Sequence, residues 1–390
     1  MPYQTRRAFS ALRQPHYSLN SHRTSQRLFF AVVAIVAFFV LAITGIFTIP
    51  PISVLLSSRQ MSKDVNQESA RDRGSRERSY VAIITVLNSS SHGYKTALES
   101  MTCYAYQNDY KFIVVNNTVY QKLCPQRDFF FQRHCIVAHL LATYNYRWML
   151  FVDTDIGVVN EKRTVEEYIR DDADVIFYDR FFNFEIMAGS YLVKKSKFAI
   201  NFLHGWANFE NRLPEKFSGS DNGAIHMYLA EMIAPDSSLI PRCWKLWHDT
   251  VNFETLTRYT LCCREVMKNT PPSNVFIYGK GKGWARDAWL SNSHWNPESD
   301  FMFHSLKDIY RKEFDEEDER QAVKILNVDF ISWINTLRSP LDLEKCRKKT
   351  MMWNHEPGLI VSSERLQSHL DERRQAVEKE YRGKLHFIHQ

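Results

Sequence analysis

The longest feature in the hydrophobic pattern is one uninterrupted apolar run near the N-terminus. Residues 28–49 contain 19 apolar residues among 22 and no charge. At about 1.5 Å per residue, a helix of this length spans roughly 33 Å, the thickness of a bilayer core. A signal-peptide core has only about 7–15 apolar residues after a short leader, whereas 27 mainly polar residues precede this run. The run therefore predicts a membrane anchor rather than a cleaved signal or a buried core helix.

The charges that flank the run predict its orientation. The residues before it include no acidic side chain and five basic ones, namely Arg6, Arg7, Arg13, Arg23 and Arg27. The nearest basic residues after it are Arg59 and Lys63. Because basic residues favour the cytoplasmic side, we expect a single-pass type II protein with most of its chain lumenal. The formal charge of +6 leaves only +1 outside the tail, so the charge does not predict nucleic-acid binding.

The remaining pattern divides the chain into a stem and one larger domain. Pro50 and Pro51 end the apolar run, and the residues up to 79 are rich in Ser, Gln and alternating charges. We therefore predict a cytoplasmic tail at 1–27, an anchor at 28–49, a stem at 50–79 and a lumenal domain at 80–390.

Apolar runs alternate with helix-like segments through the first half of the lumenal domain. Strands are predicted at 80–87, 111–115, 148–152 and 174–178, and helices at 92–107 and 132–146. Near-continuous apolar strands separated by helices indicate a mostly parallel sheet that is covered on both faces. Such α/β sheets bind ligands at the carboxyl ends of their strands.

Cysteines and glycosylation sequons agree with a lumenal domain. All seven cysteines follow the apolar run, and the sequence has no Cys-x-x-Cys pair, which disfavours a zinc ribbon or a thioredoxin-type site. Their odd number leaves at least one cysteine free or paired between chains. Asn88 and Asn116 begin sequons for N-glycosylation, although such tripeptides often arise by chance.

The candidate chemistry lies directly after the strand at 148–152, where Asp153-Thr154-Asp155 follows. Two carboxylates at a buried strand end can hold a hard divalent ion and leave positions open for phosphate oxygens. A second Asp-x-Asp triplet begins at Asp172, but it precedes a strand in a polar turn, where a cap or a surface loop is the simpler interpretation. The sequence therefore favours the first triplet as a metal site.

The strand at 81–87, the helix at 132–146 and the segment WMLFVDTDIGVVN together resemble the nucleotide-sugar-binding half of GT-A-type glycosyltransferases. Within these enzymes the chain is most similar to an uncharacterised nematode family assigned as nucleotide-diphospho-sugar transferases. That family is itself similar to fungal α-galactosyltransferases and plant xyloglucan xylosyltransferases. The resemblance covers roughly residues 80–310 and implies an α/β, GT-A-like (Rossmann-like) fold with a mixed, mostly parallel sheet flanked by helices.

The resemblance also implies a metal and donor site. Asp153 and Asp155 would bind Mn²⁺ (or Mg²⁺) that bridges the diphosphate of the donor, with His304 completing the metal shell. His304 has a buried core role as its alternative, and His294 competes with it. The predicted donor-binding residues are Thr85, Asn88, Thr154 and Gly189, together with Lys280 and Lys282 of a glycine-rich loop.

Several of these positions keep a plain structural alternative. Gly189 would let the backbone approach the donor sugar, or it simply forms a turn. Asp221 would bind sugar hydroxyls or face the anomeric carbon, or it caps a helix. The glycine-rich loop that holds Lys280 and Lys282 would close over a diphosphate. Trp284 and its neighbouring tryptophans would stack on an acceptor sugar or pack in the core.

These observations predict a metal-dependent glycosyltransferase in the Golgi membrane. It would move a hexose or pentose from a nucleotide-diphosphate sugar, most simply a UDP-sugar, to a hydroxyl of a glycan or glycoprotein acceptor, with retention of configuration by analogy. The alternative is a membrane-tethered protein that binds nucleotide sugars or glycans without turnover.

Overall fold

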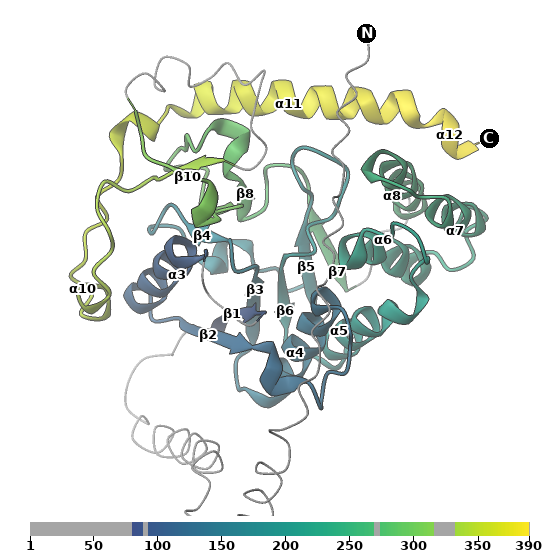
Figure 1. Ribbon diagram of the computed structural model, residues 1–390, viewed down its shortest axis with the longest axis horizontal. Helices are drawn as coiled ribbons and strands as arrows, with labels where there is room; N and C mark the ends of the chain where they lie inside the picture. The colour runs from purple at the N-terminus through teal and green to yellow at the C-terminus, as the bar shows by residue number, and fades with distance from the viewer. Residues whose placement is uncertain (1–79, 89–92, 269–273, 316–331, 390) are drawn as a thin grey trace, which may run out of the picture. The chain divides into compact units, whose positions relative to one another are not determined.

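The computed structural model describes residues 80–88, 93–268, 274–315 and 332–389 (Figure 1). They belong to one unit of the chain, Glu77–Gln390. The predicted tail, anchor and stem lie outside the described residues and stay predictions. Among the residues described, no helix has both the length and the apolar character needed to cross a membrane.

A six-stranded mixed sheet forms the centre of this unit. Its order is β2-β1-β3-β6-β5-β7, and every strand except β6 runs in the same direction. The strands are β1 Val81–Leu87, β2 Lys111–Asn116, β3 Trp148–Val152, β5 Val175–Tyr178, β6 Ser190–Lys194 and β7 Val275–Tyr278. The predicted α/β class with a mixed, mostly parallel sheet is therefore confirmed.

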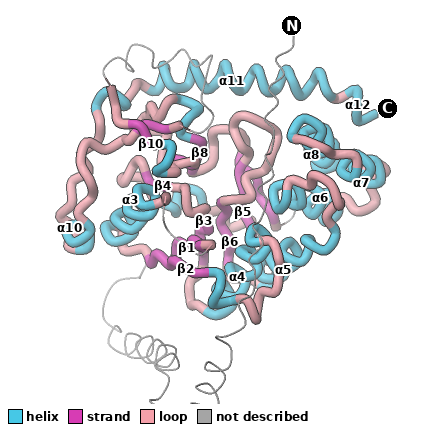
Figure 2. Tube along the Cα trace, in the orientation of Figure 1, coloured by secondary structure: helices cyan, strands magenta, loops and turns pink. Residues whose placement is uncertain are grey.

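Alternate residues of the central strands enter two separate cores. In β1, Ala82 and Ile84 face one core, and Val81 and Ile83 face the other. All four side chains are fully buried. Helices lie on both sides of the strands (Figure 2), with α3 on one side and α4, α5 and α6 on the other (Figure 1). Burial of both faces explains why these strands read as continuous apolar runs.

The helices differ from the predicted ranges at their ends. The helix predicted at 132–146 begins earlier, because the Asp128 side chain accepts a hydrogen bond from the Phe130 N–H at 2.9 Å and caps it. It ends before Tyr144, whose backbone is extended. The helices are α3 Lys95–Gln107, α4 Phe129–Thr143, α5 Lys197–Asn208, α6 Ser220–Ile233, α7 Ile240–His248, α8 Phe253–Met267, α10 Leu343–Arg347, α11 Ser363–Lys384 and α12 His386–His389.

A smaller sheet joins a late segment of the chain to the end of β3. It has the order β4-β9-β8, with β4 Gly157–Val158, β8 Ala285–Asp287 and β9 Met302–His304. β4 follows the Asp153-Thr154-Asp155 triplet directly and pairs antiparallel with β9. This pairing places β9 next to the carboxyl edge of the central sheet. A separate two-stranded ladder joins β10 Arg311–Lys312 to β11 Trp333–Ile334.

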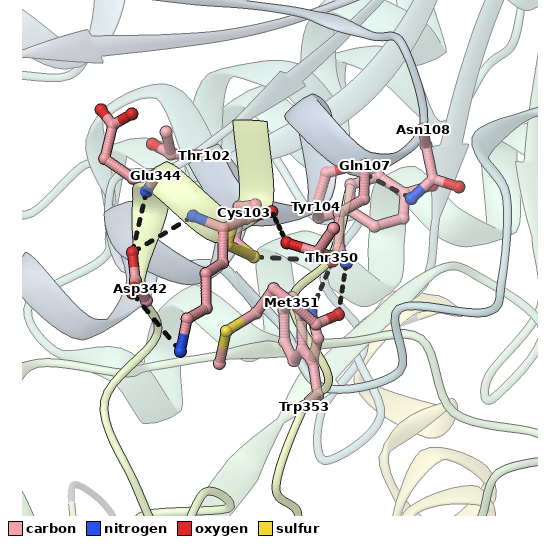
Figure 3. Close-up of a disulfide and its surroundings, with 12 residues drawn as sticks. Thr102, Cys103, Tyr104, Gln107, Asn108, Asp342, Glu344, Thr350, Met351 and Trp353 are labelled. Atoms are coloured by element: carbon pink, nitrogen blue, oxygen red, sulfur yellow. Dashed lines mark hydrogen bonds and ion pairs between the residues drawn. A yellow bond between two sulfur atoms is a disulfide. The ribbon is translucent and has the colours of Figure 1, made fainter. Parts of the chain in front are cut away.

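Disulfides fix the C-terminal region and account for six of the seven cysteines. Cys103 of α3 bonds Cys346 of α10, and Figure 3 shows this bond beside the contacts of Gln107. The Gln107 side chain bonds the Met351 carbonyl and the Trp353 indole, both at 2.7 Å. The other two disulfides are Cys124–Cys135 and Cys243–Cys262. Cys263 is buried and forms no disulfide, as the odd cysteine count predicts.

Candidate metal and donor site

Asp153 and Asp155 lie at the carboxyl edge of β3, as the sequence predicts. The Asp153 N–H donates to the Gly189 carbonyl at 2.7 Å, and the Ile156 N–H donates to the Asp153 carbonyl at 2.9 Å. These bonds close a tight turn between the central sheet and β4. The side chains of Asp153 and Asp155 are 24% and 10% exposed, so both carboxylates are largely withdrawn from water.

His304 lies beside these carboxylates. Its Nε2 is 3.4 Å from Oδ1 of Asp155. One ligand atom from each of Asp153, Asp155 and His304 can be chosen so that all three lie within 4.8 Å of one another. The Leu306 N–H also donates to the Asp155 carbonyl at 2.9 Å, which fixes β9 against the triplet. Among the described residues, the group at this edge is Asp153, Asp155 and His304, so His294 does not belong to it. Nδ1 of His294 is instead bonded to the Ser291 carbonyl.

The three ligand types fit a divalent cation such as Mn²⁺, since carboxylate oxygens and an imidazole nitrogen are its usual donors. Positive side chains also lie against these carboxylates. Lys307, which the sequence did not single out, places Nζ 3.8 Å from Oδ2 of Asp155. Burial lowers the pKa of His304, but the neighbouring Asp155 and Asp287 outweigh it and raise that pKa to about 10. Cation binding at Nε2 of His304 would therefore release the proton that this nitrogen carries in the charged imidazole.

Gly189 has a role that differs from the predicted approach to a sugar. A Cβ atom at this position would overlap the Asp153 carboxylate, which lies directly over the glycine backbone. The Gly189 carbonyl also accepts the Asp153 N–H. Gly189 therefore provides space for the side chain of Asp153, a candidate metal ligand, and contact with a donor sugar stays a prediction.

Asp221 is fully buried and lies behind the site. Its Oδ2 accepts hydrogen bonds from Nη2 of Arg133 at 2.6 Å and from Nε2 of His134 at 3.0 Å. Asp221 belongs to the first turn of α6, whose N-cap is Gly219, so it does not cap the helix. The predicted contact with sugar hydroxyls or the anomeric carbon has no support in this geometry, because the carboxylate has no exposed surface.

Arg133 connects Asp221 to the metal-binding edge. While its Nη2 binds Asp221, its Nη1 pairs with Oδ1 of Asp153. The guanidinium is almost fully buried between two rings, with its central carbon 5.0 Å from the Phe130 centroid and 5.5 Å from the Phe151 centroid. The two carboxylates raise the pKa of Arg133 against the opposing effect of burial, so this buried group stays charged.

The sequence contains a signal for Arg133. It occupies the same helix face as Ile136, Val137 and Leu140, because these residues follow it by three, four and seven positions. A charged residue on a core-facing stripe needs a buried partner. The sequence cannot name that partner, because Asp153 and Asp221 come from two other elements.

The two predicted donor-binding threonines lie together at this edge. Oγ1 of Thr85 is 3.4 Å from Oγ1 of Thr154, which also lies 3.4 Å from the Val86 carbonyl. Asn88 follows the end of β1 and is exposed. β1 and β3 are adjacent and parallel, so their ends lie side by side.

The predicted phosphate-binding lysines are placed differently. The Lys280 amine donates to the carbonyls of Arg180, at 2.6 Å, and Asn183. Burial lowers its pKa to about 8. Lys282 is exposed in the same loop. Neither lysine is paired with the metal-binding aspartates, so their contact with phosphate stays a prediction.

The tryptophans that were candidates for acceptor stacking are buried. Trp284, Trp289 and Trp295 are at most 5% exposed. The Trp284 indole N–H donates to Oγ of Ser190 at 2.9 Å. The packing alternative therefore describes these residues.

Asn88 is exposed, and Asn116 is half-buried. Oδ1 of Asn116 accepts hydrogen bonds from the N–H of Thr118 at 3.0 Å and from its hydroxyl at 2.7 Å. Glycosylation of Asn88 and Asn116 stays a prediction.

A comparison of the sequence with models of protein families shows which family the chain belongs to. The family model described as "Protein of unknown function, DUF273" matches residues 101–321, more than half of the chain. The chain belongs to the DUF273 family. The DUF273 match includes Asp153, Asp155 and His304 but begins after β1. A search of curated proteins found no match.

Two solved structures similar to this DUF273 chain are glycosyltransferases. One, involved in glycosylation of the major capsid of PBCV-1, has 11% identity and a TM-score of 0.37, and the alignment covers 57% of this chain and 92% of that one. The other, GlyE of Streptococcus pneumoniae TIGR4, has 11% identity and a TM-score of 0.27, with coverage of 55% and 73%. Likeness at this level does not carry an activity across, so the function has to be argued from the site.

Proposed function

We propose that the chain is a metal-dependent glycosyltransferase of the GT-A type. It would transfer a hexose or pentose from a nucleotide-diphosphate sugar to a hydroxyl of a glycan or glycoconjugate. The observation that carries the proposal is the convergence of Asp153, Asp155 and His304 at the carboxyl edge of the sheet, with ligand atoms within 4.8 Å of one another. Asp153, Asp155 and His304 would hold a divalent cation, which would supply Lewis-acid assistance to the leaving diphosphate.

The other residues at this edge suit the proposed donor. Lys307 is half-exposed and beside Asp155, so its amine can turn from that carboxylate to a diphosphate oxygen. Thr154 is half-buried and offers a hydroxyl at the edge where Asn88 is exposed, and we place the nucleoside there. Thr85 is 1% exposed, so its hydroxyl would support Thr154 rather than contact the donor. A UDP-sugar is the donor that we propose, from the resemblance seen in the sequence.

The buried position of Asp221 bears on the stereochemistry. A carboxylate with no exposed surface and an arginine partner cannot attack the anomeric carbon as a nucleophile. If configuration is retained, as the resemblance implies, the acceptor hydroxyl would then attack from the face that the diphosphate leaves. The Golgi location and the membrane anchor at residues 28–49 remain part of the proposal.

One observation favours a second candidate, a nucleotide-sugar-binding protein without turnover. Arg133 occupies Oδ1 of Asp153, and Asp221 is unavailable as a second catalytic carboxylate. A site of this kind can hold a cation and a nucleotide without transferring the sugar.

The test is release of nucleoside diphosphate by full-length protein incubated with Mn²⁺ and a panel of nucleotide sugars. We expect release from at least one donor and a loss of at least about 100-fold in Asp155→Asn. Asp172→Asn, in the other Asp-x-Asp triplet, is the matched control and should keep wild-type activity, since Asp172 pairs with Arg170 at the surface.

The outcomes separate the two candidates. Mn²⁺-dependent binding of UDP without release from any donor would support the binding protein. Release that is unchanged in Asp155→Asn would contradict the metal assignment.

A further inference from the structure

The metal-facing histidine is held by a carboxylate that sequence reasoning did not find. Asp287 is the last residue of β8, and the parallel pairing of β8 with β9 puts it directly opposite His304. Its Oδ1 lies 2.7 Å from Nδ1 of His304. Asp287 is 3% exposed, so water does not compete for this hydrogen bond.

This contact determines which nitrogen of the imidazole is available. A carboxylate can only accept, so Nδ1 carries the proton and donates it to Asp287. In the neutral imidazole, the lone pair is then on Nε2, which is the nitrogen 3.4 Å from Asp155. A carboxylate partner also makes the imidazole a stronger ligand.

Asp287 is itself held in place. Nη2 of Arg180 lies 3.1 Å from its Oδ1, and the Ser305 hydroxyl lies 3.2 Å from the same atom. Nη1 of Arg180 is 3.4 Å from Glu185, and the Arg180 carbonyl accepts from Lys280. The lysine of the glycine-rich loop is therefore connected to the site through Arg180.

Asp287 is outside the group of ligand atoms. Among the described residues, the cluster at this edge consists of Asp153, Asp155 and His304. Asp287 therefore contacts the site through His304 and does not face the cation position.

We propose that Asp287 is a positioning residue that holds His304 with Nε2 directed at the divalent cation. The proposal rests on the proposed function, because it assumes that His304 is a metal ligand. A purely structural alternative exists, in which the Arg180–Asp287 ion pair only joins the two sheets. The two roles differ in whether the effect of Asp287 depends on His304.

A double-mutant cycle on Mn²⁺ affinity separates these roles. Affinity is measured by electron paramagnetic resonance of free Mn²⁺ with full-length protein, with and without UDP. Asp287→Asn should weaken Mn²⁺ binding by roughly 10–100-fold, and His304→Ala by at least as much. In the His304→Ala background, Asp287→Asn should cause no further loss. Glu185→Gln removes the other carboxylate partner of Arg180 and is the control that should keep wild-type affinity.

Wild-type Mn²⁺ affinity in Asp287→Asn would overturn the proposal. An equal further loss of affinity when that change is added to His304→Ala would overturn it as well. If the Asn variant fails to fold, Asp287→Glu keeps the charge but moves the carboxylate, and the same cycle applies to it. Unchanged Mn²⁺ affinity in His304→Ala would also reject the proposal. If Asp155→Asn loses Mn²⁺ binding in the same experiment, the proposed function still stands. Absence of Mn²⁺ binding by the wild type, with and without UDP, would reject both.

Discussion

Gly189 illustrates how a residue without a side chain determines where a neighbouring carboxylate lies. The Asp153 carboxylate lies in the space that a side chain at this position would fill. The strands on either side of this contact, β3 and β6, are packed into the two apolar cores. The backbone at Gly189 therefore has little freedom to move away from Asp153. The conformation of Asp153 therefore depends on the absence of a Cβ atom at residue 189.

Gly189→Ala should weaken Mn²⁺ binding by at least about 10-fold, because Asp153 has to leave its position. Gly279→Ala is the matched control, since nothing lies within 4 Å of a Cβ atom there. Isothermal titration of both variants with Mn²⁺ and UDP measures the difference. Wild-type affinity in Gly189→Ala would show that the position of Asp153 does not matter for the metal.

The buried His226 of α6 should make the free energy of unfolding depend on pH. It is fully buried, its Nε2 accepts the Ile186 N–H at 3.0 Å, and its Nδ1 donates to the Asn222 carbonyl at 2.7 Å. Both ring nitrogens are therefore used by the neutral form. Burial lowers the pKa of His226 from 6.5 to about 4. The unfolded chain binds a proton below pH 6.5 and the folded chain only near pH 4, so stability falls as pH decreases through this range.

Between pH 7.5 and pH 5, this group should cost the wild type about 2 kcal/mol in the free energy of unfolding. His226→Gln removes the titrating group, so the variant should lose about 2 kcal/mol less than the wild type over the same interval. Urea unfolding of both proteins at the two pH values gives the comparison. His134, whose pKa burial also lowers to about 4, contributes equally to both proteins. Identical pH dependence would mean that His226 is not neutral in the fold.

At the scale of elements, the sequence predicts the strands better than the site. β3 has the predicted bounds, and the mostly parallel sheet follows from its buried strands. The small sheet could not be predicted, because β4, β8 and β9 have only two or three residues and show no periodicity. The role of Asp287 could not be predicted from the sequence either. It lies beside His304 because of the register in which β8 pairs with β9.

The contact between α4 and α6 leads to a prediction about stability. Arg133→Met leaves the buried Asp221 without its guanidinium partner, so the free energy of unfolding should fall by about 3–5 kcal/mol. Adding Asp221→Asn should recover part of this loss, since an uncharged amide is less costly to bury. Arg258→Met, which breaks an exposed pair with Glu254, should change the free energy of unfolding by less than about 1 kcal/mol.

Urea unfolding of these variants measures the effects. A double variant that is less stable than Arg133→Met alone would contradict the account of the buried ion pair. Such a result would mean that Asp221 stabilises the fold through His134 rather than through Arg133.

At the scale of the whole molecule, the candidate site joins parts of the chain that are far apart in sequence. The segment that follows β3 supplies two carboxylates, β9 supplies the imidazole, and α4 supplies the arginine behind them. The C-terminal region closes the fold with the Cys103–Cys346 disulfide and with α11, which lies across one side of the unit (Figure 1). The site therefore depends on the folding of the unit Glu77–Gln390 as a whole.

The central claim is that Asp153, Asp155 and His304 together bind the cation of a nucleotide-diphosphate complex. Anomalous diffraction from crystals grown with Mn²⁺ and UDP tests it most directly. The account predicts a manganese peak within bonding distance of both carboxylates, of Nε2 of His304 and of the diphosphate oxygens. No peak at this edge, or a peak bonded to other residues, would contradict it.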